Sequence, residues 1–194
     1  MSNATDATEE NMQSLLLWAE LRDVGVLVNN VGMHQGGSKP FPQIDVKKIT
    51  ESLHVNCLYP TLLTSLLLQR VFLKRANRCL IVNVSSVVGC SSGVPSMAVY
   101  AATKAFNHSF SVSLSADLFN TNVDVLCVNP GLTASKMTKV KASLVCSSAD
   151  ECAEGALNKA GLVDIIPHWK HAAMWVAMAA GDWIPAVPRA WIMN

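Results

Sequence analysis

Three short apolar runs constrain the fold more than any other feature of the chain. They are residues 24–28 (VGVLV), 79–84 (CLIVNV) and 123–128 (VDVLCV), rich in β-branched residues and each followed by a polar loop. Apolar runs of this length without alternation indicate strands buried on both faces, which are typical of parallel sheets. Helical patterns at residues 45–74 and 96–119 separate the runs. We therefore expect a parallel α/β sheet with right-handed crossovers.

The rest of the chain fits one domain of 194 residues, of which 51% are hydrophobic. We expect residues 1–10 to be disordered or to cap a helix, and residues 168–194 to form an apolar tail, which holds four of the five tryptophans. The other expected elements are a short amphipathic helix at 11–21, a helix at 149–159, a short strand or extended segment at 163–166, and an apolar helix at 171–184 broken near Gly181-Asp182.

Composition excludes several classes of protein. The net charge is +1 and no Lys/Arg cluster is interleaved with aromatic residues, so we expect no nucleic-acid partner. The six cysteines form no CxxC pair and the polar start is no signal peptide, which indicates reduced thiols in a cytosolic environment.

Polar residues interrupt the apolar stretch 58–73, so we expect a helix packed on the sheet, not a membrane span. The tryptophan-rich tail fits either a membrane interface or a helix of a substrate pocket or oligomer.

Tyr100 and Lys104 are four residues apart in a helical pattern, and this spacing places them on one helix face. An ammonium beside a phenol favours the phenolate and lowers the tyrosine pKa from about 10 towards neutral pH. A tyrosine tuned in this way can pass protons. The spacing also arises by chance, so the surrounding residues must decide between a catalytic pair and an ordinary surface pair.

Polar residues follow each of the three predicted strands: NNVG at 29–32, Ser85-Ser86, and PGLTAS at 130–135. Ligands of open parallel sheets bind outside the carboxyl ends of the strands. Tyr100 and Lys104 begin the helix that follows the second strand, so they reach the same rim. A hydroxyl, a phenol and an ammonium converging there suit carbonyl chemistry, in which the oxygen is polarised and then protonated.

These motifs, with Asn56 and the sequences NVSS and YAATK, resemble the short-chain dehydrogenases/reductases in order and spacing. The stretches VGVLVNNVGM, AVYAATKAF and NPGLTASKM are most similar to the branch of very-long-chain 3-oxoacyl-CoA reductases and 17-beta-hydroxysteroid dehydrogenases of types 3 and 12. The resemblance implies a Rossmann-like, doubly wound parallel sheet. It also implies reduction of the keto group of a 3-oxoacyl-CoA or 17-ketosteroid, a lipid-like substrate, with NADP(H), although NAD stays open.

The branch implies further expectations about place and assembly. Its members are typically attached to the endoplasmic reticulum membrane, so we expect the cytosolic face of that membrane, with the cytoplasm as the alternative. Contact of the tryptophan-rich tail with the membrane surface and formation of a homodimer are two further expectations.

The resemblance also assigns roles to residues. Tyr100 would protonate the carbonyl oxygen, Ser86 would hydrogen-bond that oxygen, Lys104 would bind the nicotinamide ribose and lower the Tyr100 pKa, and Asn56 would hold a water in a proton relay. Besides Tyr100 and Lys104, the implied cofactor contacts are Asn29, Val31 and Gly32 on the adenosine-ribose side, Pro130, Gly131 and Thr133 beside the nicotinamide, and Ser135 at the phosphates.

The sequence departs from the family pattern in two places. Ser86 and Tyr100 are fourteen residues apart instead of thirteen, and we still assign Ser86 as the active hydroxyl. The family's TGxxxGxG phosphate loop and first strands are absent; GMHQGG at 32–37 follows the wrong strand and predicts only a loop. We expect residues 1–194 to form one N-terminally truncated Rossmann-like reductase domain, with strand 24–28 as a bare apolar edge. The alternative is a non-catalytic interaction module or inactive fragment.

No metal site is predicted. His168 and His171 form an HxxH pair, but no carboxylate or cysteine stands at ligand spacing, so surface or pocket-rim positions are expected. Cys90, near the catalytic loop, fits either an exposed thiol or a small apolar filler.

Overall fold

The structure is a computed structural model that describes residues 9–181. Most of the segment expected to be disordered, residues 1–8, lies outside the described residues. The same holds for residues 182–194 of the expected tail, and hence for the predicted helix break near Gly181-Asp182. Glu9 and Glu10, the last residues of the segment expected to be disordered or to cap a helix, are the first two residues of α1.

Four parallel strands form the sheet in the order β1-β2-β3-β4. Val26 of β1 lies opposite Leu80 of β2, and Cys79 of β2 lies opposite Val123 of β3. The prediction of a parallel α/β sheet is therefore confirmed. The strand bounds are β1 (Val26–Asn29), β2 (Cys79–Val84), β3 (Val123–Val128) and β4 (Asp164–Ile165).

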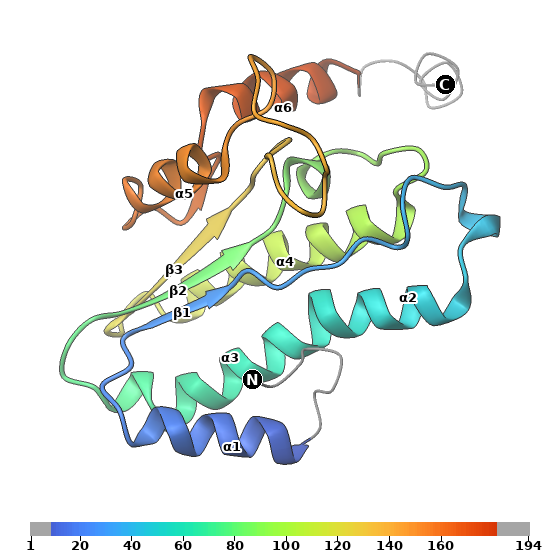
Figure 1. Cartoon of the computed structure of the whole chain (residues 1–194). Helices are drawn as coiled ribbons and strands as arrows, with labels where there is room; N and C mark the ends of the chain where they lie inside the picture. The colour runs from blue at the N-terminus through green and yellow to red at the C-terminus, as the bar shows by residue number, and fades with distance from the viewer. Residues whose placement is uncertain (1–8, 182–194) are drawn as a thin grey trace.

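Helices cover both faces of this sheet, as in a doubly wound fold (Figure 1). Helices α1 and α3 lie on one side of the sheet, and α5 and α6 lie on the other. The helix bounds are α1 (Glu9–Glu20), α2 (Val46–Leu53), α3 (Tyr59–Arg70), α4 (Ala98–Asp117), α5 (Ala149–Leu157) and α6 (Trp169–Gly181).

The two faces of the sheet bury alternate residues of the same strands. Leu27, Ile81 and Val125 belong to a core cluster that includes residues of α1 and α3. Val82 and Leu126 belong to a second cluster on the other face, which reaches α5. A buried aliphatic side chain of this size contributes about 1.5–3 kcal/mol. Burial on both faces explains why β2 and β3 are continuously apolar in sequence.

Strand β1 forms one edge of the described sheet, and the face of this strand opposite Leu27 is exposed to solvent. Val26 and Val28 are each 55% exposed, whereas Leu27 between them is buried against the cluster that includes Leu16 and Ala19 of α1. The prediction of an apolar edge at this strand is confirmed for the described residues. Within residues 9–181, no helix has the length and apolar content that crossing a membrane requires.

The helical pattern at residues 45–74 is interrupted, contrary to the prediction of one continuous helix. A single turn of π-helix, η3 (His54–Leu58), joins α2 to α3, and the N–H of Tyr59 bonds to the carbonyl of His54 five residues earlier. Pro60 lacks an N–H, so the carbonyl of Asn56 has no donor four residues ahead. Asn56 thus lies in the π turn, a local geometry that is frequent at functional sites.

Candidate active site

Tyr100 and Lys104 lie one turn apart at the start of α4, as the spacing predicted. The Lys104 Nζ atom is 5.7 Å from the centre of the Tyr100 ring. Lys104 is only 4% exposed, and its ammonium donates a hydrogen bond of 2.8 Å to the carbonyl of Val84, the last residue of β2. The pair is therefore held at the carboxyl end of the central strands.

The pKa values of this pair differ from the expectation. Burial raises the pKa of Tyr100, and a hydrogen bond with the Ser86 side chain opposes this shift only in part. Burial also lowers the pKa of Lys104 from 10.5 to about 8. The expected lowering of the Tyr100 pKa by Lys104 is not found, because the ammonium lies over the ring and donates to Val84, and burial dominates for both groups.

Ser86 lies beside Tyr100, so the fourteen-residue spacing keeps the predicted serine in place. It caps the short helix η5 (Val87–Cys90), where its Oγ accepts a bond from the N–H of Val88 and donates one of 3.2 Å to the carbonyl of Pro130. The neighbouring Ser85 has a structural role, since its buried Oγ donates to the carbonyl of Lys104 at 2.6 Å. The two adjacent serines thus differ in their hydrogen-bond partners.

Asn56 is fully buried and ties the loop after β1 to α4. Its Oδ1 accepts from the N–H of Met33 at 2.8 Å, and its Nδ2 donates to the Met33 carbonyl at 2.9 Å and to Thr103 Oγ1 at 3.0 Å. Thr103 Oγ1 in turn donates to the carbonyl of Tyr100 at 2.8 Å. The side chain of Asn56 therefore connects two protein segments at the site, and the water relay stays a prediction.

The first predicted cofactor group is divided between the rim and the interior. Gly32 lies at the rim, because a Cβ built on it would be 3.5 Å from Lys104 Nζ. Val31 is also exposed there. The Asn29 side chain points inward, where its Nδ2 donates to Thr64 Oγ1 at 2.9 Å and to Asn83 Oδ1 at 2.8 Å. Asn29 therefore ties the sheet to α3 through its side chain.

The second predicted group follows β3, and its members differ in their surroundings. The Pro130 carbonyl accepts from Ser86 Oγ and from the N–H of Val87, so it adjoins Ser86. Gly131 packs against the main chain of His171, and Thr133 Oγ1 lies 3.3 Å from His171 Nε2. Ser135 is exposed and bonds to Thr138 in a local turn.

His171 is a buried residue of α6, so the prediction of a surface or pocket-rim position is wrong for it. It is 0% exposed, its Nε2 lies 2.7 Å from Ser147 Oγ, and burial lowers its pKa. The apolar sequence around it, HAAMWVA, was the available signal for burial. Across residues 9–181, no group of three or more His, Cys, Asp or Glu side chains could hold a metal ion.

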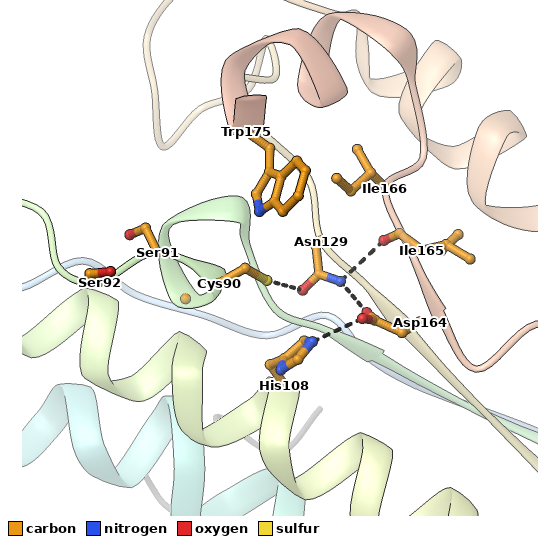
Figure 2. A pocket seen from close by; sticks show the side chains of 10 residues that line it. Cys90, Ser91, Ser92, His108, Asn129, Asp164, Ile165, Ile166 and Trp175 are labelled. Atoms are coloured by element: carbon orange, nitrogen blue, oxygen red, sulfur yellow. Dashed lines mark hydrogen bonds and ion pairs between the residues drawn. The ribbon is translucent and has the colours of Figure 1, made fainter. Parts of the chain in front are cut away.

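A pocket of about 680 Å³ lies next to η5, between the ends of β3 and β4 and helix α6 (Figure 2). Its floor is a polar network. Cys90 Sγ donates to Asn129 Oδ1 at 3.3 Å, Asn129 Nδ2 donates to Asp164 Oδ1 at 2.5 Å, and Asp164 Oδ2 lies 3.0 Å from His108 Nε2. Trp175 of α6 points into the pocket from above.

Cys90 is half-buried and takes part in this network, and burial raises its thiol pKa to about 11. It is thus a neutral donor at neutral pH. Asn129, Asp164 and His108 were not predicted as pocket residues, because they come from three separate segments of the chain. Within residues 9–181, the residues that line the pocket include neither lysine nor arginine; they are Gly89, Cys90, Ser91, Ser92, His108, Asn129, Asp164, Ile165, Ile166 and Trp175.

The parallel sheet with helices on both faces is a Rossmann-like fold, and the comparisons with known proteins show its family. The family model described as "short chain dehydrogenase" matches residues 3–144. The chain therefore belongs to the short-chain dehydrogenase family.

Curated relatives have the names of lipid and steroid enzymes. A very-long-chain 3-oxoacyl-CoA reductase of Neurospora crassa is 31% identical over 84% of this chain and 48% of its own length. A very-long-chain 3-oxoacyl-CoA reductase-like protein of Arabidopsis thaliana is 32% identical over 87% of this chain and 54% of its own length. A hydroxysteroid dehydrogenase-like protein 1 of Gallus gallus is 28% identical over 88% of this chain and 51% of its own length. The chain thus spans about half the length of the curated relatives it matches.

Solved structures share the fold. A short-chain dehydrogenase from Sphingobium yanoikuyae in complex with NADPH has a TM-score of 0.74 and 25% identity, covering 94% of this chain and 72% of its own. A short-chain dehydrogenase from Burkholderia cenocepacia in complex with NADP has a TM-score of 0.75 at 21% identity, and the match covers 94% of this chain and 74% of that chain.

Proposed function

We propose that the protein is an NADPH-dependent reductase that converts the keto group of a lipid-like substrate, a 3-oxoacyl-CoA or a 17-ketosteroid, into a hydroxyl group. The observation that carries the proposal is the meeting of Ser86, Tyr100 and Lys104 at the carboxyl end of β2. The names of the curated relatives support the substrate classes.

The residues at the nicotinamide end fit a dinucleotide. Lys104 has three N–H donors, of which Val84 takes one, so two can bind ribose hydroxyls beside Gly32. Pro130, Gly131 and Thr133 would border the nicotinamide, and Val31, Ser135 and the main chain at Asn29 would lie along the rest of the cofactor. NADPH, when bound, supplies a hydride to the carbonyl carbon. NADP is preferred over NAD because a solved relative is in complex with NADPH.

Tyr100 is suited to donate a proton to the carbonyl oxygen. Burial raises its pKa, so the phenol is protonated at neutral pH, as the reductive direction requires. The side chain of Ser86, bonded to Tyr100, would orient the same oxygen. Asn56 holds the main chain around Tyr100 through Thr103 and would support proton return to the site.

The pocket beside η5 fits the apolar part of a substrate. Ile165, Ile166 and Trp175 provide an apolar wall, and the described lining residues offer no lysine or arginine to the phosphates of a CoA group. A steroid body or an acyl chain suits this pocket, and CoA phosphates would need another part of the surface.

Membrane-surface contact and a homodimer belong to the same proposal. Trp169 and Val176 of α6 are 65% and 57% exposed, which supports contact of this helix with a lipid surface, such as the cytosolic face of the endoplasmic reticulum. Flotation of the chain with liposomes tests the contact, and loss of flotation in Trp169→Ser is expected. Sedimentation equilibrium tests the dimer.

A non-catalytic interaction module is the second candidate function. The exposed Val26 and Val28 on edge strand β1 favour it, because an uncovered apolar edge is a surface that pairs with other chains.

Calorimetric titration of the chain with NADPH separates the two functions. The reductase proposal predicts micromolar binding that is lost in Lys104→Met, with Lys136→Met as a surface control that keeps it. Binding of this kind would exclude the module for this chain. No detectable binding would exclude catalysis by it.

A further inference from the structure

Two residues of the loop after β1 contact Tyr100 from different sides. Gln35 is 2% exposed, and its Oε1 accepts a hydrogen bond of 2.9 Å from the main-chain N–H of Tyr100. The ring of His34 stacks on the Tyr100 ring, with 4.9 Å between centroids and 28° between planes. One residue therefore holds the main chain of the tyrosine, and its neighbour holds the phenol ring.

The start of α4 needs a partner from elsewhere. Met97 stands at the N-cap position and its side chain makes no capping bond, so the first N–H groups of the helix lack a local acceptor. Gln35 supplies that acceptor from a segment 65 residues earlier. Its Nε2 also donates to the carbonyl of Ser96 at 3.0 Å, which accepts from the N–H of Lys39 as well. Ser96 has a φ of +61°, a strained left-handed conformation that these bonds hold in place.

The loop itself is anchored on its other side. Met33 makes two main-chain bonds with the buried side chain of Asn56. The Nδ1 of His34 accepts from the N–H of Gly37 at 3.1 Å, which fixes the ring and leaves the proton of the neutral ring on Nε2. Asn56, Met33, His34, Gln35 and Tyr100 thus form a continuous chain of contacts from the π turn to the phenol.

We propose that Gln35 and His34 are positioning residues for Tyr100, in which Gln35 fixes the main chain at the start of α4 and His34 fixes and covers the phenol ring. The placement of the ring stands on geometry alone. Its consequence for catalysis rests on the proposed reductase function.

Titration of the tyrosine itself tests the placement without cofactor or substrate. The chain has two tyrosines, so Tyr59→Phe leaves Tyr100 as the only phenol whose ultraviolet absorbance reports ionisation. Burial holds the Tyr100 pKa above its ordinary value. In that background, His34→Ala should uncover the ring and shift the titration midpoint downwards, whereas His34→Phe keeps a stacked ring and should keep the high midpoint. Circular dichroism over the same pH range identifies unfolding. The same titration of the protein unfolded in urea gives the pKa of the solvent-exposed tyrosine.

Two outcomes of this titration overturn the assignment of His34. One is an unchanged midpoint in folded His34→Ala. The other is a midpoint in folded His34→Phe that falls as far as that of His34→Ala, because a stacked ring alone would then not cover Tyr100.

Kinetics test the role of Gln35. Gln35→Ala should lower kcat by about 10- to 100-fold through misplacement of Tyr100, with little change in the KM for NADPH. Gln35→Glu, which keeps an oxygen acceptor for the Tyr100 N–H, should recover part of the loss. Gln69→Ala, at an exposed position on α3, is the matched control. Equal kcat in Gln35→Ala and this control overturns the role of Gln35. If the natural chain and all its variants are inactive while the tyrosine titration behaves as predicted, the proposed function fails and the placement by His34 stands.

Discussion

Gly89 of η5 lies against the main chain of Lys104 in α4. A Cβ built on Gly89 would be 2.5 Å from the carbonyl carbon of Lys104 and 2.7 Å from the nitrogen of Ala105, closer than atoms can approach. Only glycine allows this packing. Because Ser86 begins the same short turn, the contact of Gly89 with α4 helps to set Ser86 beside Tyr100.

Gly89→Ala should therefore separate η5 from α4. We expect a loss of about 1 to 3 kcal/mol in the free energy of unfolding, measured with urea, because main-chain atoms cannot yield as a side chain can. Gly25→Ala is the matched control, since its new methyl would meet the flexible end of Arg75 at 3.3 Å and main-chain atoms no nearer than the Arg78 carbonyl at 4.0 Å. Equal stability of the two variants would contradict this packing.

Lys104 should make stability depend on pH in an identifiable window. Its pKa is about 8 in the folded chain against 10.5 when free, so the unfolded chain binds more protons between these values and stability rises with pH across them. The cost of the buried ammonium, on the order of 3 kcal/mol, is fully present below about pH 8. The stability advantage of Lys104→Met over the natural chain should therefore shrink from pH 8 to 10.5. A difference independent of pH would disprove the burial effect.

Asn29 should be important for stability even without a cofactor. Its side chain bonds to Thr64 and Asn83, and Asn83 Nδ2 donates to Ser111 Oγ at 2.9 Å. Asn29→Ala removes the bonds to Thr64 Oγ1 and Asn83 Oδ1. The free energy of unfolding, measured with urea in the absence of nucleotide, should therefore fall by about 1 to 3 kcal/mol. Asn30→Ala, at the exposed neighbouring position, should cost little. If only nucleotide affinity changed in Asn29→Ala, the side chain would belong to the cofactor site instead.

His171 and Ser147 should be energetically coupled. Their side chains meet at 2.7 Å in the interior, where the bond helps to fasten α6 to the loop after β3. A double-mutant cycle of His171→Ala and Ser147→Ala, measured by urea unfolding, should give a coupling free energy of about 1 kcal/mol or more. Strictly additive effects would show that the bond does not contribute to the attachment of α6.

Much of the fold was readable from local sequence. The predicted bounds of β2 and β3 are those of the structure, because strands buried on both faces must be apolar throughout. The Tyr100–Lys104 face of α4 followed from helical periodicity, whereas the choice of Ser86 over Ser85 came from the resemblance to the family. The π turn at Asn56 was missed because Leu53, Leu58 and their neighbours continue an ordinary helical pattern across it.

Features that depend on distant partners were not readable. His171 is polar in sequence, and although its apolar neighbours were a signal for burial, its packing against Gly131 depends on the approach of α6. Asp164 and His108 meet across β4 and α4, and Gln35 reaches Tyr100 across 65 residues. The direction of the Tyr100 pKa shift was wrong because periodicity gives the position of a neighbouring charge and not the extent of burial.

The most direct test of the account is substrate-dependent oxidation of NADPH by the chain, with a long-chain 3-oxoacyl-CoA and a 17-ketosteroid as alternative substrates. Each reaction is run with the natural chain, with Tyr100→Phe and with Tyr59→Phe as the matched control. The account predicts NADPH oxidation with at least one substrate, retained in Tyr59→Phe and abolished in Tyr100→Phe. No oxidation with either substrate, or equal rates in Tyr100→Phe and the natural chain, would contradict it.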